Sequence, residues 1–222
     1  MDLKYKQISD YMESTLTCSA HNLDHVIRVY KNALLIAKNE QGVDLDILIP
    51  AALLHDIARV EESKDLSGQI DHALLGAEKA AQFLETMGYD KEKIKAICHC
   101  IETHRYRTGR VPQSIEAKIL FDADKLDAIG AIGIARTFML SGQSRQRIKI
   151  EEPLADYLKR NIGENGRIKD LSEHTPFIEY EYKIKKIPGK LYTQTAKAIA
   201  EKRMAHMADF FERLTNELEG IS

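Results

Sequence analysis

The stretch PAALLHDIARVEE, residues 50–62, is a run of small and aliphatic residues with helical periodicity, interrupted by His55 and Asp56. Two titratable side chains inside an apolar run are costly to bury unless another group binds them. The stretch therefore predicts a core helix and, in addition, a buried partner for the two polar side chains.

The composition narrows the classes of protein to which the chain can belong. It has 222 residues, of which 44% are hydrophobic and 30% charged, which suits one domain with a substantial core. A formal net charge of −2 argues against a general nucleic-acid or membrane-surface binder, although it allows a local basic pocket for a phosphorylated small molecule. Because no run resembles a signal peptide or a membrane span, we expect a cytoplasmic protein.

The three cysteines are Cys18, Cys98 and Cys100. Because their number is odd and nothing suggests secretion, we expect no disulfide framework. The CHC sequence of residues 98–100 could form half of a zinc site, but a second cysteine pair is missing. We therefore expect buried free thiols.

Helical periodicity dominates the chain, and only FIEYEYKIKKI, residues 177–187, alternates as a strand would. The predicted fold class is all-α, with one domain over residues 1–222. It would comprise a helical core in residues 1–142, a variable excursion in residues 143–191, which holds three of the five prolines, and a C-terminal helix in residues 192–222 that packs on the core. Within the core, we expect continuous helices over residues 44–62 and 114–142.

Few polar residues fall on the predicted apolar helix faces. His25 is one helical turn before Val29 on such a face, and Asp124 and Asp127 interrupt the apolar stripe of the long predicted helix. Asp122 is flanked by lysines, so we expect it to be a solvated surface acid and prefer Asp124 as a functional residue.

These buried imidazoles and carboxylates allow two interpretations. Each could have its own hydrogen-bond or salt-bridge partner, or one divalent cation could bind them together. We favour the cation, because buried charges are either paired or coordinate metals. Mixed nitrogen and oxygen ligands favour Mn²⁺, Fe, Co²⁺, Ni²⁺ or Zn²⁺ over Ca²⁺.

The order H…HD…D of these residues resembles the HD-domain metal-dependent phosphohydrolase superfamily. The motifs that carry a likeness to its YedJ- and YpgQ-type subfamily are DHVIRVY, AALLHDIAR, DHALLGAE, IETHRYR, DADKLDAIGAIGIAR and TAKAIAEKRMAHMADFF. The resemblance implies an HD-domain helical bundle with four metal ligands, namely His25, His55, Asp56 and Asp124. It also implies one divalent ion, for which we expect Mn²⁺ first, with Fe, Co²⁺, Ni²⁺, Zn²⁺ or Mg²⁺ as alternatives.

The same resemblance implies that the substrate is a nucleotide, a nucleoside triphosphate that is cleaved to a monophosphate and pyrophosphate. The alternatives are a 5′-nucleotidase or cyclic-nucleotide phosphodiesterase, and a non-catalytic metal-bearing sensor or scaffold. We expect no nucleic-acid or membrane partner, and the sequence leaves the oligomeric state open, a homodimer being one expectation.

Further site residues follow from their positions near the expected ligands. Asp127 is the candidate for orienting a ligand or taking a proton, with a structural hydrogen bond as an equal alternative, and Arg59 is the nearest charged residue after the HD pair. Superfamily members can carry an assisting acid in this region, but here the role is unassigned between Glu61 and Glu62. The candidate substrate-binding residues are Arg28, His72, His104, Arg105 and Lys125. His72 and His104 could instead hold a second metal, although we prefer a role in lining the pocket.

Overall fold

The computed structural model describes residues 3–16, 20–105, 109–163 and 167–221, with residues 20–22 described by their backbone alone. Cys18 lies outside the described residues. The described part of the chain contains helices and a single isolated β-bridge, between Ile162 and Ile168, but no strand. The all-α prediction is therefore confirmed, and FIEYEYKIKKI is helical as well.

The chain divides into two compact units, of which the first comprises residues 1–127 and 191–196 and the second residues 128–190 and 197–222. The helices of the first unit are α1 (Leu3–Thr15), α2 (Ala20–Ala37), α3 (Leu45–Leu54), α4 (Arg59–Lys64), α5 (His72–Thr86), α6 (Lys91–Thr103) and α7 (Ile115–Leu126). The helices of the second unit are α8 (Gly130–Gln143), α9 (Leu154–Asn161), α10 (Pro176–Tyr182) and most of α11 (Gln194–Glu219). The first three residues of α11 belong to the first unit. Three short 3₁₀ helices complete the second unit, η1 (Leu171–Glu173), η2 (Ile184–Lys186) and η3 (Pro188–Lys190).

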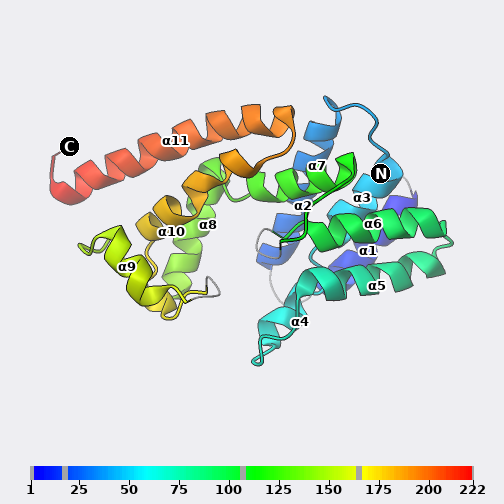
Figure 1. Cartoon of the computed structure of the whole chain (residues 1–222), viewed down its shortest axis with the longest axis horizontal. Coiled ribbons are helices and arrows are strands. Elements are labelled where there is room, and N and C mark those ends of the chain that lie inside the picture. The colour runs from blue at the N-terminus through cyan, green and yellow to red at the C-terminus, as the bar shows by residue number, and fades with distance from the viewer. Residues whose placement is uncertain (1–2, 17–19, 106–108, 164–166, 222) are drawn as a thin grey trace. The chain divides into compact units, whose positions relative to one another are not determined.

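The apolar helix α3 forms the centre of the first unit. Residues 48–54 are all buried, and α3 packs against α1, α2, α6 and α7, while α5 and α6 lie side by side (Figure 1). The helices begin where the sequence supplies capping side chains: Asp90 accepts a hydrogen bond from the Glu92 amide, and Ser114 accepts one from the Ala117 amide. The core therefore forms from helices whose start positions are encoded locally.

The helix expected over residues 44–62 is wrong in its length, because α3 ends at Leu54 and residues 55–58 form a buried turn before α4. In a continuous helix His55 and Asp56 would point about 100° apart. In the turn, His55 Nε2 and Asp56 Oδ2 lie 3.9 Å apart. The interruption therefore brings the two side chains to the same side.

The helix expected over residues 114–142 is also interrupted, at residues 127–129. Gly130 begins α8 with φ at +76°, a conformation that residues with a Cβ rarely adopt. A Cβ on Gly133 would lie 2.4 Å from the Ala128 carbonyl oxygen, so this turn requires glycine there too. Asp127 consequently caps the end of α7 instead of lying inside a long helix.

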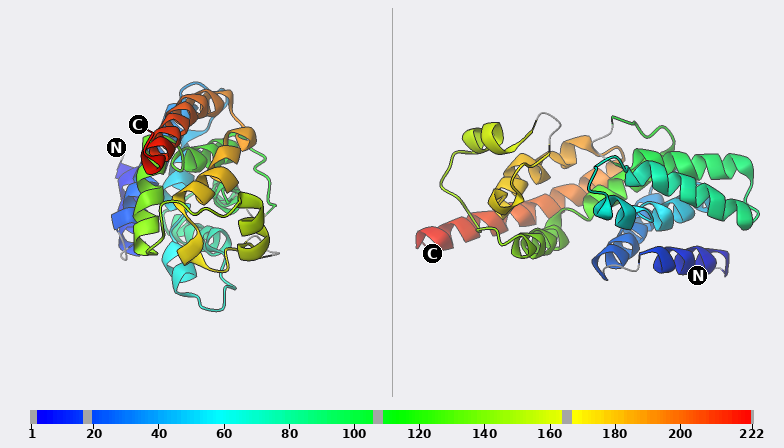
Figure 2. Two further views of the ribbon diagram at one scale, coloured as in Figure 1. Left: turned by 90° about the vertical axis from the view of Figure 1, so that its left-hand side faces the viewer. Right: turned by 90° about the horizontal axis from the view of Figure 1, so that it is seen from below.

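Aromatic side chains hold the second unit together. Phe211 of α11 stacks on Tyr180 of α10, with ring centroids 4.1 Å apart, and Phe138 of α8 meets Phe210 at 5.8 Å. Figure 2 shows these helices of the second unit from two further sides. In the described part of the chain, no helix combines the length and apolarity that crossing a bilayer requires.

Candidate metal centre

The predicted metal ligands come from three parts of the first unit. His25 lies on α2, His55 and Asp56 on the turn after α3, and Asp124 on the last turn of α7. One donor atom from each of His25, His55 and Asp56 lies within 4.8 Å of the other two. Asp124 joins them through Oδ1, which is 3.2 Å from His25 Nε2. Residues separated by a hundred positions are therefore gathered at one buried point.

His55 offers the clearest sign of a missing partner. Its Nδ1 lies 2.8 Å from the Ala52 carbonyl oxygen and must donate to it, because a carbonyl can only accept. The other ring nitrogen, Nε2, is fully buried and has no hydrogen-bond partner. Burial lowers the pKa of His55 to about 4, so the ring is neutral and Nε2 carries a lone pair near neutral pH. A buried lone pair beside carboxylates fits a divalent cation.

His25 is held in the opposite way, between carboxylates. Its Nδ1 lies 2.7 Å from Asp127 Oδ2, and its Nε2 faces Asp124 and, at 3.7 Å, Asp56. Burial alone would lower the pKa of His25, but the hydrogen bonds with Asp124 and Asp127 outweigh it and raise the pKa to about 9. Without a metal, this imidazole therefore carries a second proton on Nε2 at neutral pH.

Asp127 contacts the Nδ1 side of the His25 ring and is itself held in place by Arg28. Arg28 donates from Nε to Asp127 Oδ1 at 2.6 Å and from Nη2 to Oδ2 at 3.1 Å. Asp127 is only 1% exposed, and both of its oxygens are engaged. This geometry favours the orienting or structural role considered for Asp127 over proton transfer, and it commits Arg28 to the carboxylate.

Asp56 connects the first group to a pair of further histidines. Its Oδ1 lies 3.3 Å from His72 Nε2 and 3.6 Å from His104 Nε2, while Oδ2 faces His25 and His55. Burial would raise the pKa of Asp56, but the surrounding imidazoles hold it well below the usual range of an aspartate. The atoms of Asp56, His72 and His104 form a second group of potential metal donors, so the geometry leaves both one and two ions open.

Positive side chains surround these groups at different distances. Lys125 Nζ lies 2.5 Å from Asp124 Oδ2 and donates to the His104 carbonyl oxygen at 3.2 Å. The Arg59 side chain is 45% exposed and reaches within 4.0 Å of Asp56 Oδ2, whereas Arg105 pairs with carboxylates farther out. Lys125 and Arg59 are therefore the predicted cations that lie directly beside the candidate ligands.

The expectation of a solvated Asp122 is wrong. Its side chain is fully buried and accepts hydrogen bonds from the backbone amides of Tyr192 and Thr193 and from the Thr193 hydroxyl. The flanking lysines give information only on the neighbouring faces of α7, and they say nothing about the face that carries Asp122. The groups that bind Asp122 are about 70 positions away in sequence. Asp122 anchors the start of α11.

Glu62 is a residue of the site that the sequence did not distinguish from its neighbour Glu61. Its Oε2 lies 2.7 Å from His72 Nδ1, and its Oε1 accepts from Arg105 at 2.7 Å. The available signal was the pair of acids after the HD motif, but the choice between them depends on the orientation of α4. Glu61 pairs instead with Lys79 of α5.

The two described cysteines behave as predicted. Cys98 and Cys100 are free thiols, half-buried and buried respectively. Burial raises the pKa of Cys98 to about 11, which keeps the thiol protonated and unreactive.

The chain is similar in sequence to a known protein family and to a bacterial protein. The family model described as "HD domain" matches residues 22–129, a range that includes all four predicted ligands. The YpgQ protein of Bacillus subtilis (strain 168) is 31% identical over 222 residues, covering 97% of this chain and 94% of that protein.

Solved structures agree in fold over almost the full length. An HD-superfamily hydrolase from Bacillus thuringiensis matches with a TM-score of 0.74 and 28% identity, covering 97% of each chain. The Bacillus subtilis YpgQ structure in complex with ADP matches with a TM-score of 0.71 and 28% identity, covering 98% of this chain and 96% of that one. A predicted HD-superfamily hydrolase from an uncultured Thermotogales bacterium has a TM-score of 0.65 and 31% identity, covering 96% and 92%.

Proposed function

Since this chain belongs to the HD-domain family of metal-dependent phosphohydrolases, we propose that it converts a nucleoside triphosphate to a nucleoside monophosphate and pyrophosphate. The observation that carries the metal requirement is the buried, partnerless Nε2 of His55 among the carboxylates of Asp56 and Asp124. A nucleotide substrate is supported by the related YpgQ structure, which contains ADP.

The proposed ligands are His25, His55, Asp56 and Asp124, with Mn²⁺ as the ion. Such an ion activates water and polarises a phosphoryl oxygen. In the net reaction, a water oxygen bonds to the α-phosphorus, the bond from the α-phosphorus to the α–β bridging oxygen breaks, and pyrophosphate leaves.

The residues around the proposed ligands have separate tasks in this proposal. Asp127 and Arg28 hold His25 so that Nε2 faces the ligand group. Lys125 and Arg59 supply positive charge beside the candidate ligands, where the negative charge of a triphosphate would lie. His72 and His104 line the same point through their Nε2 atoms.

A nucleotide panel assayed in the presence of Mn²⁺ tests the proposal. We expect nucleoside triphosphates to yield the monophosphate and pyrophosphate, identified by chromatography and by separate assays for phosphate and pyrophosphate. Stepwise release of orthophosphate, or hydrolysis of monophosphates alone, would replace the proposal with a 5′-nucleotidase. Hydrolysis restricted to cyclic nucleotides would indicate a phosphodiesterase, and a metal-loaded protein without any turnover would indicate a sensor.

A further inference from the structure

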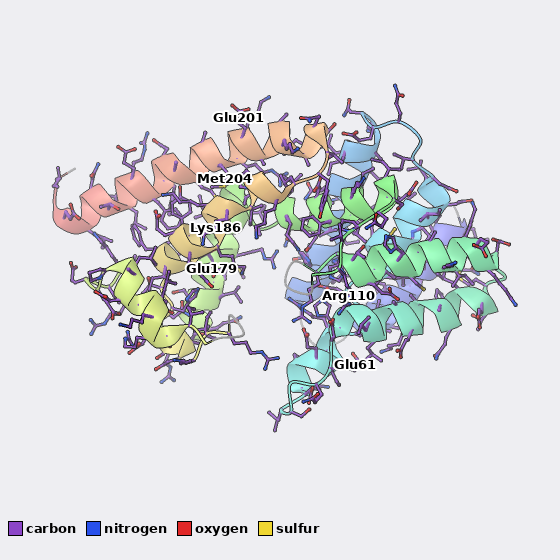
Figure 3. The ribbon with its side chains drawn as sticks, in the orientation of Figure 1. Glu61, Arg110, Glu179, Lys186, Glu201 and Met204 are labelled. Atoms are coloured by element: carbon purple, nitrogen blue, oxygen red, sulfur yellow. The ribbon has the colours of Figure 1, made fainter. Side chains whose placement is uncertain are left out.

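Charged side chains on the Nδ1 side of His72 form a network of ion pairs. Arg105 donates to Glu62 Oε1 and lies 3.1 Å from Asp71 Oδ1, and Arg110 (Figure 3) donates to Asp71 Oδ2 at 2.5 Å. Asp71 also caps α5 by accepting a hydrogen bond from the Ala73 amide. This ion-pair network thus connects α4, the start of α5 and the residues that follow α6.

Within this ion-pair network, Glu62 is the residue that contacts a side chain of the site, His72. Its Oε2 contacts His72 Nδ1 at 2.7 Å, whereas its contact with Arg59 Nη1 is longer, at 3.4 Å. An ionised carboxylate can only accept hydrogen bonds, so the proton of this contact belongs to His72 Nδ1. Because Arg105 occupies the other oxygen, the Glu62 carboxylate is fixed from both sides.

The contact with Glu62 is the shortest that His72 Nδ1 makes, since Arg59 Nη1 lies 3.2 Å from the same atom. The ring is 2% exposed, and with Nδ1 on Glu62 its Nε2 lies 3.3 Å from Asp56 Oδ1 and 3.3 Å from His104 Nε2. A ring turned over about its χ2 bond would place carbon atoms against both carboxylates instead. The orientation of the His104 ring does not depend on a carboxylate, because its Nδ1 lies 2.5 Å from the Ile101 carbonyl oxygen.

We propose that Glu62 is a positioning residue that acts through His72, keeping Nε2 of the ring directed at the site, with Arg105 holding the carboxylate in place. The proposal rests on the proposed function in taking His72 as part of the lining of the substrate-binding point. It places Arg105 behind the site, in contact with carboxylates, instead of on the substrate.

Two variants of α4 isolate this role. Glu62→Leu removes the acceptor of the His72 proton, and Glu62→Gln retains an acceptor oxygen without the charge. Glu61→Leu is the matched control, because Glu61 (Figure 3) is the adjacent carboxylate of the same helix and pairs with Lys79 of α5. Thermal unfolding of all three variants checks that each is folded.

The first readout is the ¹⁵N spectrum of His72 in the metal-free protein, which does not depend on activity. We expect Nδ1 to carry a hydrogen-bonded proton in the wild type and in Glu61→Leu, and we expect the Nδ1 signal to shift in Glu62→Leu, where this hydrogen bond is lost. An unchanged His72 spectrum in folded Glu62→Leu would overturn the proposal.

The second readout is a double-mutant cycle measured with the hydrolysed nucleotide. Loss of the carboxylate that orients a metal-ligating histidine typically costs about 10-fold to 100-fold in metal affinity or activity, and this range is the scale we adopt for His72. We expect a loss of this size in kcat/KM for Glu62→Leu, partial recovery in Glu62→Gln, and no further loss when Glu62→Leu is added to His72→Ala. Full additivity of the two substitutions would contradict the proposal. If the wild type hydrolyses no nucleoside triphosphate, the proposed function fails, while the spectrum of His72 still decides the role of Glu62.

Discussion

Metal binding should release a proton from His25, and this sets a measurable pH dependence. The pKa of His25 is raised from the usual 6.5 to about 9, because its hydrogen bonds with Asp124 and Asp127 outweigh its burial. The Nε2 proton and a metal ion compete for the same lone pair. Metal affinity should therefore fall as the pH decreases below about 9, by about tenfold per pH unit for one competing proton. His55 adds nothing in this range, because its pKa is lowered to about 4.

Calorimetry of Mn²⁺ binding to the metal-free protein measures this effect directly. Titrations at pH 7 in two buffers of different ionisation enthalpy should show about one proton released per ion. Between pH 6 and 8, the affinity should rise by about 100-fold, as the tenfold change per unit requires. Asp127→Asn removes one of the carboxylates that stabilise the protonated ring and should reduce the proton release, whereas Asp24→Asn, on an exposed residue of α2, should not. No proton release in the wild type, or an affinity independent of pH, would refute the reasoning.

Two further predictions concern Asp122 and the number of ions. Asp122→Ala leaves the backbone amides of Tyr192 and Thr193 and the Thr193 hydroxyl without their acceptor, so denaturant unfolding should show a loss on the order of 3 kcal/mol. An unchanged free energy of unfolding would exclude the anchoring role. An anomalous-scattering map of the Mn²⁺-loaded protein should contain one ion per chain, and His104→Ala should change KM or kcat without lowering the metal content. Two ions about 3.5–4 Å apart, with His72 or His104 in coordination range, would overturn the single-metal prediction and favour the phosphodiesterase alternative.

The periodicity of apolar residues predicted the helical class, and it singled out His25 and Asp124, which lie close together in the structure. His25 and Asp124 interrupt apolar faces, and such interruptions are visible wherever a helix is regular. Helix starts such as those at Asp90 and Ser114 are also encoded locally, because the capping side chain and its helix are adjacent in sequence.

What could not be predicted depends on departures from regular helices and on partners that are distant in sequence. The turn at residues 55–58 and the break at residues 127–129 occur inside stretches whose periodicity suggests continuous helices. Asp122 was expected to be exposed because its neighbours in sequence are lysines. It is buried because the groups that bind it lie at the start of α11, about 70 positions away. Glu62 and Glu61 are neighbours on one short helix, so only the tertiary structure distinguishes the one that contacts His72.

The metal content of His55→Ala tests the central claim most directly, because His55 Nε2 is buried without a hydrogen-bond partner and would bind the proposed ion. After loading with Mn²⁺ and removal of excess ion, elemental analysis should find about one ion per chain in the wild type and almost none in folded His55→Ala. Full occupancy in the variant would contradict the assignment of His25, His55, Asp56 and Asp124 as the metal site.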